Sequence, residues 1–170
     1  MKTLLIGLKA VFYMTVFVSV FAMIALSVRS FDRYLGVALP AGSEIPGIVL
    51  MIAGGILGLL CAGTFVVRGQ GTPAPFDAPK KFVAIGPYRH VRNPMYIGGL
   101  LLLAGFGLYQ HSVSILILAA ALSGGVHLLV VFYEEPALRK VFGETYQEYC
   151  SATRRWIPGA PRVPGTETRD

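Results

Sequence analysis

Residues 95–133, MYIGGLLLLAGFGLYQHSVSILILAAALSGGVHLLVVFY, decide the fold of this chain. The stretch contains no Asp, Glu, Lys or Arg. A helix needs about 20 residues to cross about 30 Å of hydrocarbon, so this stretch is about twice as long as one membrane span. We therefore predict a helical hairpin, with arms Met95–Tyr109 and Ser112–Tyr133 that turn at Gln110 and His111.

Two further apolar runs precede the hairpin, Leu8–Val28 and Gly47–Val67, and each is long enough for one helical span. The whole chain of 170 residues is 54% hydrophobic and 14% charged, which is too apolar for one water-soluble core. The first run is longer than the apolar part of a signal peptide, and no small-x-small cleavage site follows it. We therefore predict an all-α, polytopic membrane protein with about four transmembrane helices.

The positive charge lies on one side of this arrangement. Of the 15 Lys and Arg residues, all but Arg29 and Arg33 belong to the amino terminus, to residues 68–94 or to the tail after the hairpin. Cytosolic loops carry an excess of Lys and Arg. We expect both termini and the active face to be cytosolic, and the net charge of +6 to reflect this topology rather than nucleic-acid binding.

The connecting segments predict a lid and a tail helix. Residues 68–93 are rich in Gly and Pro but include apolar side chains, which indicates an ordered cytosolic lid loop. Pro136 should bend or restart the fourth span. After it, the apolar positions of a C-terminal amphipathic helix, lying against the membrane or the lid, recur at helical spacing: Leu138, Val141, Phe142, Tyr146 and Tyr149.

The chain therefore divides into three parts. Residues 1–67 form two transmembrane helices with an outward loop, residues 68–158 form the core with lid, hairpin and tail helix, and residues 159–170 form a disordered tail. The sequence lacks the spacings of a metal site, and Cys61, inside a span, is not expected to meet Cys150 on the tail.

Three clusters of residues that could form a functional site lie on the predicted cytosolic side: residues 86–98, the pair Glu134 and Glu135, and residues 142–158. Each has a simpler explanation when taken alone. The first can be a basic loop beside the membrane, the Glu pair can favour a helix start, and the tail can be a surface anchor. His90 can be a solvated loop residue, whereas His127 lies inside a span, where an ionisable side chain is a functional candidate.

Taken together, the clusters resemble one superfamily. The pattern G-P-Y-x-x-x-R-[HN]-P-x-Y-x-G starts at Gly86, and E-E-x-x-L-x-x-x-F-G-x-x-Y-x-x-Y starts at Glu134. Their order and spacing resemble the integral membrane methyltransferases typified by isoprenylcysteine carboxyl methyltransferase. The sequences around Asn93 and Tyr133 are closer to phosphatidylethanolamine N-methyltransferase. The resemblance covers roughly residues 69–158.

This resemblance implies a site for S-adenosylmethionine without a Rossmann domain, built by the last two spans, the lid and the tail helix. It implies that the Glu pair and the region around Arg92 contact the cofactor, with arginines at its carboxylate and tyrosines around it. The implied catalytic residues are Glu134, Glu135, Arg92 and Asn93. The implied cofactor-binding residues are Tyr88, Arg89, Pro94, Tyr96, Gly98, Tyr146, Tyr149 and Arg154.

The chemistry of methyl transfer fits such a set. Transfer from a sulfonium is an in-line displacement that depends on alignment, and an apolar pocket favours it when the nucleophile is an anion. An amine acceptor must also lose a proton, for which Glu134 or Glu135 is the available base. Asn93 stands where isoprenylcysteine-type enzymes commonly have His, which disfavours that acceptor.

The leading hypothesis is a membrane enzyme that uses S-adenosylmethionine to methylate a lipid or lipid-like acceptor. A second hypothesis is a non-catalytic membrane protein that keeps the same fold for binding or assembly. A transporter or channel would need polar residues along its spans, and here His127 is nearly alone in that position.

Overall fold

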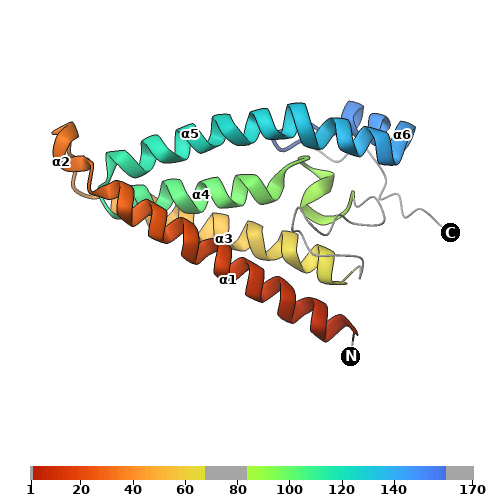
Figure 1. Ribbon diagram of the computed structural model, residues 1–170, viewed down its shortest axis with the longest axis horizontal. Helices are drawn as coiled ribbons and strands as arrows, with labels where there is room; N and C mark the ends of the chain where they lie inside the picture. The colour runs from red at the N-terminus through yellow and green to blue at the C-terminus, as the bar shows by residue number, and fades with distance from the viewer. Residues whose placement is uncertain (1, 68–83, 160–170) are drawn as a thin grey trace.

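The computed structural model describes residues 2–67 and 84–159, and these fold as a bundle of helices (Figure 1). The helices are α1 (Lys2–Arg29), α2 (Asp32–Leu35), α3 (Glu44–Val67), α4 (Pro94–Tyr109), α5 (Val113–Leu129) and α6 (Glu135–Ala152). A 3₁₀ turn, η1 (Gly86–Arg89), precedes α4, and a π turn, η2 (Val130–Glu134), joins α5 to α6. The described residues contain no strand, so the predicted all-α fold is confirmed.

Four helices provide the predicted spans. The segments Val11–Leu35, Glu44–Thr64 and Val113–Ala152 are long and apolar enough to cross a membrane, and Pro94–Tyr109 is a shorter apolar helix. Their outer faces expose large apolar side chains, among them Phe12 at 63%. Such surfaces need lipid as their solvent. Most of the predicted lid, residues 68–83, lies outside the described residues, as do residues 160–170 of the tail.

The hairpin forms where the sequence predicted it. His111 adopts a positive φ of 52° in the turn, and Ser112, fully buried, caps α5 by accepting a hydrogen bond from the Ile115 N–H at 3.2 Å. The loop between α1 and α3 is tied to this turn, because the Ser114 N–H donates to Asp32 Oδ1 at 2.8 Å. His111 Nε2 lies 2.7 Å from Glu44 Oε1, which adds a second tie.

Glycines let α3 and α4 approach until their backbones touch. A Cβ on Gly54 would lie 2.5 Å from the Gly98 carbonyl oxygen, and one on Gly105 would lie 2.6 Å from the Gly47 carbonyl oxygen. Both pairs are antiparallel neighbours separated by seven residues on each helix, so they stand on one face of each. Small residues recur at helix contacts of this kind in membrane proteins, because they let two backbones approach closely.

A π turn carries α5 into α6 ahead of Pro136. The Glu135 N–H bonds the Val130 carbonyl, five residues back, instead of the usual four. Proline lacks an N–H and its ring crowds the preceding turn, so the wider turn accommodates it without ending the helix. The expected bend or restart at Pro136 therefore takes the form of a π turn.

Helix α6 is amphipathic, as predicted. Tyr146 and Tyr149 are buried, with Leu138 and Phe142 packed against them, whereas Val141 is 71% exposed. Because the predicted apolar face lies against the membrane or the lid, the contact of Val141 stays a prediction. The regular spacing breaks at Gly143, whose φ of 53° and ψ of −128° is a conformation that glycine adopts readily and other residues rarely do.

The glycine contact generates a stability prediction with a matched control. Gly54→Ala places a methyl group against the backbone of α4, which must move, and we expect a loss of roughly 1–3 kcal/mol in unfolding free energy. Gly55→Ala meets nothing within 4 Å and should leave stability equal or slightly higher. Thermal unfolding midpoints of both variants in detergent test this, and equal midpoints would contradict the proposed contact.

Candidate active site

The predicted site residues gather at one end of the bundle, opposite the α4–α5 turn. Figure 1 shows η1, the start of α4 and helix α6 at this end, together with the start of α1 and the end of α3. The chain after α6 returns here as well, because the Arg92 N–H donates to the Arg154 carbonyl at 2.9 Å. Segments that are far apart in the sequence thus meet over the ends of the spans.

The tail is fastened to the segment before α4 by a short ladder of hydrogen bonds. Besides the Arg92 bond, the Gly159 N–H donates to the His90 carbonyl at 3.0 Å, and Asn93 Nδ2 donates to the Arg155 carbonyl at 3.2 Å. Gly159, the first residue of the predicted disordered tail, is therefore held in place. The Asn93 amide acts here as a clamp on the tail.

Glu135 is the centre of the site. Its side chain is 5% exposed, and both carboxylate oxygens accept from Arg155, with Nε to Oε1 at 2.7 Å and Nη2 to Oε2 at 3.0 Å. Arg92 Nη1 lies 3.1 Å from Oε1, and Arg139 Nη2 lies 3.7 Å from Oε2. A two-pronged pair of this kind fixes orientation as well as charge. The bond to Glu135 raises the pKa of the Arg155 guanidinium above its ordinary value.

Arg92 has a donor that nothing in the described residues accepts. Its Nη1 also donates to Cys150 Sγ at 2.8 Å, and its side chain is 12% exposed. Its Nε is buried and has no hydrogen-bond partner. A buried donor without an acceptor is costly unless a ligand or water completes it. Three guanidinium groups, those of Arg92, Arg139 and Arg155, also surround the Glu135 carboxylate. We call these four residues the arginine cluster, and it retains an excess of positive charge.

Glu134 faces a different partner. It is half-buried, and its Oε1 accepts a hydrogen bond from the hydroxyl of Tyr96 on α4. Adjacent carboxyl groups thus have separate roles, since Glu135 is enclosed by arginines and Glu134 is held by a neutral phenol. Of the two, Glu134 is the carboxylate that remains available to a further ligand.

Buried tyrosines of α6 lie against the segment that precedes α4. Tyr146 and Tyr149 are buried beside Ala84 with ring centroids 6.1 Å apart, and the Tyr149 hydroxyl donates to the Tyr88 carbonyl at 2.6 Å. Burial raises the pKa of Tyr88 well above its ordinary range, so this phenol stays neutral. The predicted tyrosines of η1 and α6 therefore lie together, and the bond between Tyr149 and Tyr88 joins α6 to η1.

The four remaining predicted site residues take no part in the ion pairs that the structure describes around Glu135. Gly98 packs against Gly54 of α3, and Pro94 is fully buried at the first turn of α4, so both have clear packing roles. Arg89 and Arg154 are exposed. The described residues contain no group of three His, Cys, Asp or Glu side chains placed to hold a metal.

Arg155 was missed among the candidate site residues, for which Arg154 was chosen. Thr153 ends α6 in an extended conformation, with φ −120° and ψ 128°. The hydrogen bond between the Arg92 N–H and the Arg154 carbonyl sets which of the two arginines faces Glu135. This pairing is a tertiary contact, and no local pattern in the tail indicates it.

Comparisons with known proteins give one match. The sequence model of the phospholipid methyltransferase family matches residues 35–145, which include α3, α4, α5 and part of α6. No curated protein matches the chain, and no solved structure matches it.

The arginine cluster generates a second stability prediction. Glu135→Gln leaves Arg92 buried without its counter-charge, and we expect a loss of roughly 2–4 kcal/mol, reduced from the fully buried case because Arg155 is 29% exposed. The control is Glu144→Gln on the exposed side of α6, which should change stability by less than about 0.5 kcal/mol. Chemical unfolding in detergent measures both, and an unchanged Glu135→Gln variant would show that this pair does not hold the site together.

Proposed function

Because the chain belongs to the phospholipid methyltransferase family, we propose that it transfers a methyl group from S-adenosylmethionine to a lipid or lipid-like acceptor in the membrane. The observation that carries the proposal is the arginine cluster around Glu135, with the unpartnered Nε of Arg92 at its buried side. The cluster lies within the predicted motifs and at the end of the bundle where the tail closes over the spans.

The cluster suits the carboxylate of an amino-acid cofactor. Arg92 has a free, buried N–H donor, and the excess positive charge around Glu135 favours an anion. Glu135 already accepts from Arg155 and faces Arg92, so we assign it the task of positioning those guanidinium groups rather than of touching the cofactor. Arg89 and Arg154, exposed at the same end, are secondary candidates for the carboxylate.

When bound, S-adenosylmethionine would supply an electrophilic methyl group on its sulfonium. The tyrosines Tyr88, Tyr96, Tyr146 and Tyr149 would offer aromatic faces, which attract cations, at the pocket wall. The apolar spans beside the cluster exclude water, so alignment and desolvation supply most of what methyl transfer needs from the protein. Little acid–base chemistry is required apart from deprotonation of the acceptor.

Glu134 is our candidate for the group that takes this proton from the acceptor. An amine acceptor must become neutral before its lone pair can attack a methyl group. Glu134 accepts from the Tyr96 hydroxyl at Oε1, which orients the carboxylate and leaves it able to receive a proton from the acceptor. We assign Glu134 the role of general base and Tyr96 the role of orienting it.

The arrangement of the chain is compatible with access from two sides. The start of α1 lies at the same end of the bundle as α6, which suits a topology in which the amino terminus and the tail share the cytosolic side (Figure 1). In our proposal the cofactor enters from the cytosol and the acceptor enters sideways from the bilayer.

The direct test is methyl transfer by purified protein. Protein in nanodiscs made from a bacterial lipid extract is incubated with S-adenosylmethionine labelled in its methyl group, and the lipids are separated and counted. We expect label in a lipid fraction, a loss of about 100-fold or more in kcat for Glu134→Gln, and unchanged activity for Lys140→Gln on the exposed side of α6. Absence of labelled lipid from folded wild-type protein would contradict the enzymatic proposal.

Binding separates the role of Arg92 from that of Glu134. We expect Arg92→Lys, which keeps the charge but loses Nε, to weaken S-adenosylmethionine binding about 10-fold or more, and Glu134→Gln to leave it nearly unchanged. Calorimetric titration in detergent measures both. Tight cofactor binding by wild-type protein without any turnover would favour the alternative, a non-catalytic membrane protein that keeps the fold for binding or assembly.

A further inference from the structure

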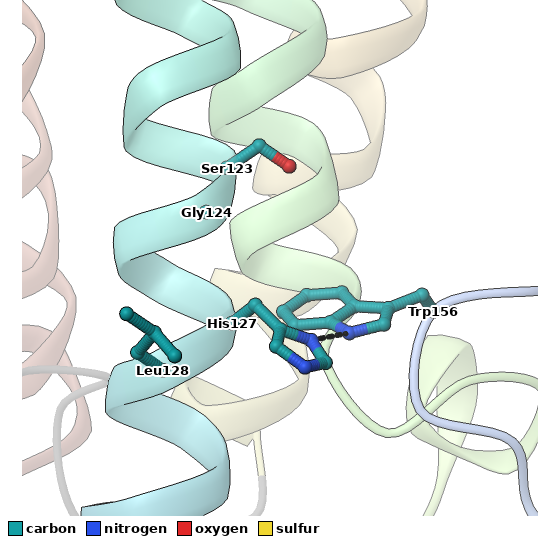
Figure 2. Close-up of a pocket in the computed structure, with 5 residues that line it drawn as sticks. All are labelled: Ser123, Gly124, His127, Leu128 and Trp156. Atoms are coloured by element: carbon teal, nitrogen blue, oxygen red, sulfur yellow. Dashed lines mark hydrogen bonds between the residues drawn. The ribbon is translucent and has the colours of Figure 1, made fainter.

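A second feature lies along α5, where the residue that follows Arg155 in the tail meets that helix. Ser123, Gly124, His127 and Leu128 form one wall of a hollow of about 410 Å³, and Trp156 of the tail forms the other (Figure 2). All four α5 residues are exposed, with Leu128 at 55%. The proposed methyl-transfer chemistry does not use this hollow.

The hydrogen bond between its two rings fixes the state of His127. Trp156 Nε1 lies 3.0 Å from His127 Nδ1, as Figure 2 shows. An indole N–H is only a donor, so Nδ1 must accept and cannot carry a proton. The imidazole is therefore neutral with its proton on Nε2.

This tautomer changes the expectation for His127. In this arrangement its one ring lone pair is already occupied by the Trp156 N–H. What remains is an N–H donor at Nε2. A π turn also separates His127 from Glu134, so their offset of seven residues is not a regular helical spacing that places them on one face.

The position of the hollow favours a lipid. His127 is 14 residues from Val113, the first residue of α5, or about 21 Å along the helix, which places it toward the cytosolic edge of the hydrocarbon in the proposed topology. Tryptophan prefers this depth. Leu128, an apolar side chain that lines the hollow, is 55% exposed. Arg154, exposed two residues before Trp156, adds positive charge near the same edge.

We propose that this hollow holds the phosphate of a membrane phospholipid, with His127 Nε2–H and the Ser123 hydroxyl as donors and the acyl chains along the outer face of α5. Ser123 and His127 are then headgroup-positioning residues, and Trp156 holds the His127 tautomer that donates.

The cofactor fits this hollow less well. Its carboxylate has a buried, unpartnered donor and excess positive charge at Arg92, whereas the hollow offers only neutral donors on an exposed helix face. An occupant with long apolar chains and an anionic acceptor group matches both the wall and the donors.

Trp156 is the only tryptophan of the chain, so its fluorescence reports on the hollow directly. The probe is dihexanoyl phosphatidylethanolamine, titrated into protein in a maltoside detergent without S-adenosylmethionine. We expect a saturable change in Trp156 emission, and a midpoint raised about 10-fold by His127→Phe, which keeps a ring but removes the donor. The control variant, His111→Phe at the opposite end, should leave the midpoint unchanged.

Two further titrations test the choice of occupant. Dihexanoylglycerol, which lacks the phosphate, should produce no saturable change at the same concentrations, and neither should inorganic phosphate. An equal response to either compound would overturn the proposal, as would a His127→Phe midpoint equal to that of wild type. Because no turnover is measured, phospholipid binding is decided independently of the methyl-transfer reaction.

Discussion

The ion pair between Glu135 and the guanidinium groups of Arg92 and Arg155 joins three segments that are far apart in the sequence: the entry to α4, the start of α6 and the returning tail. A buried carboxylate of this kind is unfavourable unless cations and hydrogen bonds surround it, so the three segments must come together. The same ion pair holds Arg92, whose Nε has no partner among the described residues, within a cluster that has an excess of positive charge. The candidate site is a consequence of this one constraint.

The constraint can operate only because the spans beneath it are closely packed. Glycines bring the backbones of α3 and α4 into contact, which sets where α4 begins and hence where Arg92 lies. On the other side, the π turn before Pro136 sets the rotation of α6, so that Glu135 faces the arginines while Glu134 faces Tyr96. Two neighbouring carboxylates thus acquire different environments.

Much of this architecture could be predicted from the sequence, because span length and charge asymmetry are local properties. The hairpin, its turn at His111 and the amphipathic character of α6 are confirmed. The choice of Arg154 over Arg155 depended on which side chain of the tail faces Glu135, and the pairing of the tail with Arg92 decides this. The bond between His127 and Trp156 likewise arises from tertiary folding, and no spacing indicates it.

The central claim is that the cofactor's carboxylate meets Arg92 while Glu135 holds that arginine in place. The measurement that tests it most directly is an experimental structure of the protein with S-adenosylhomocysteine in a lipid environment. Our account predicts the carboxylate of this product within hydrogen-bond distance of Arg92 Nε, with the Glu135 to Arg155 pair intact. A product molecule bound away from Arg92, or one whose ammonium replaces the arginines at Glu135, would contradict it.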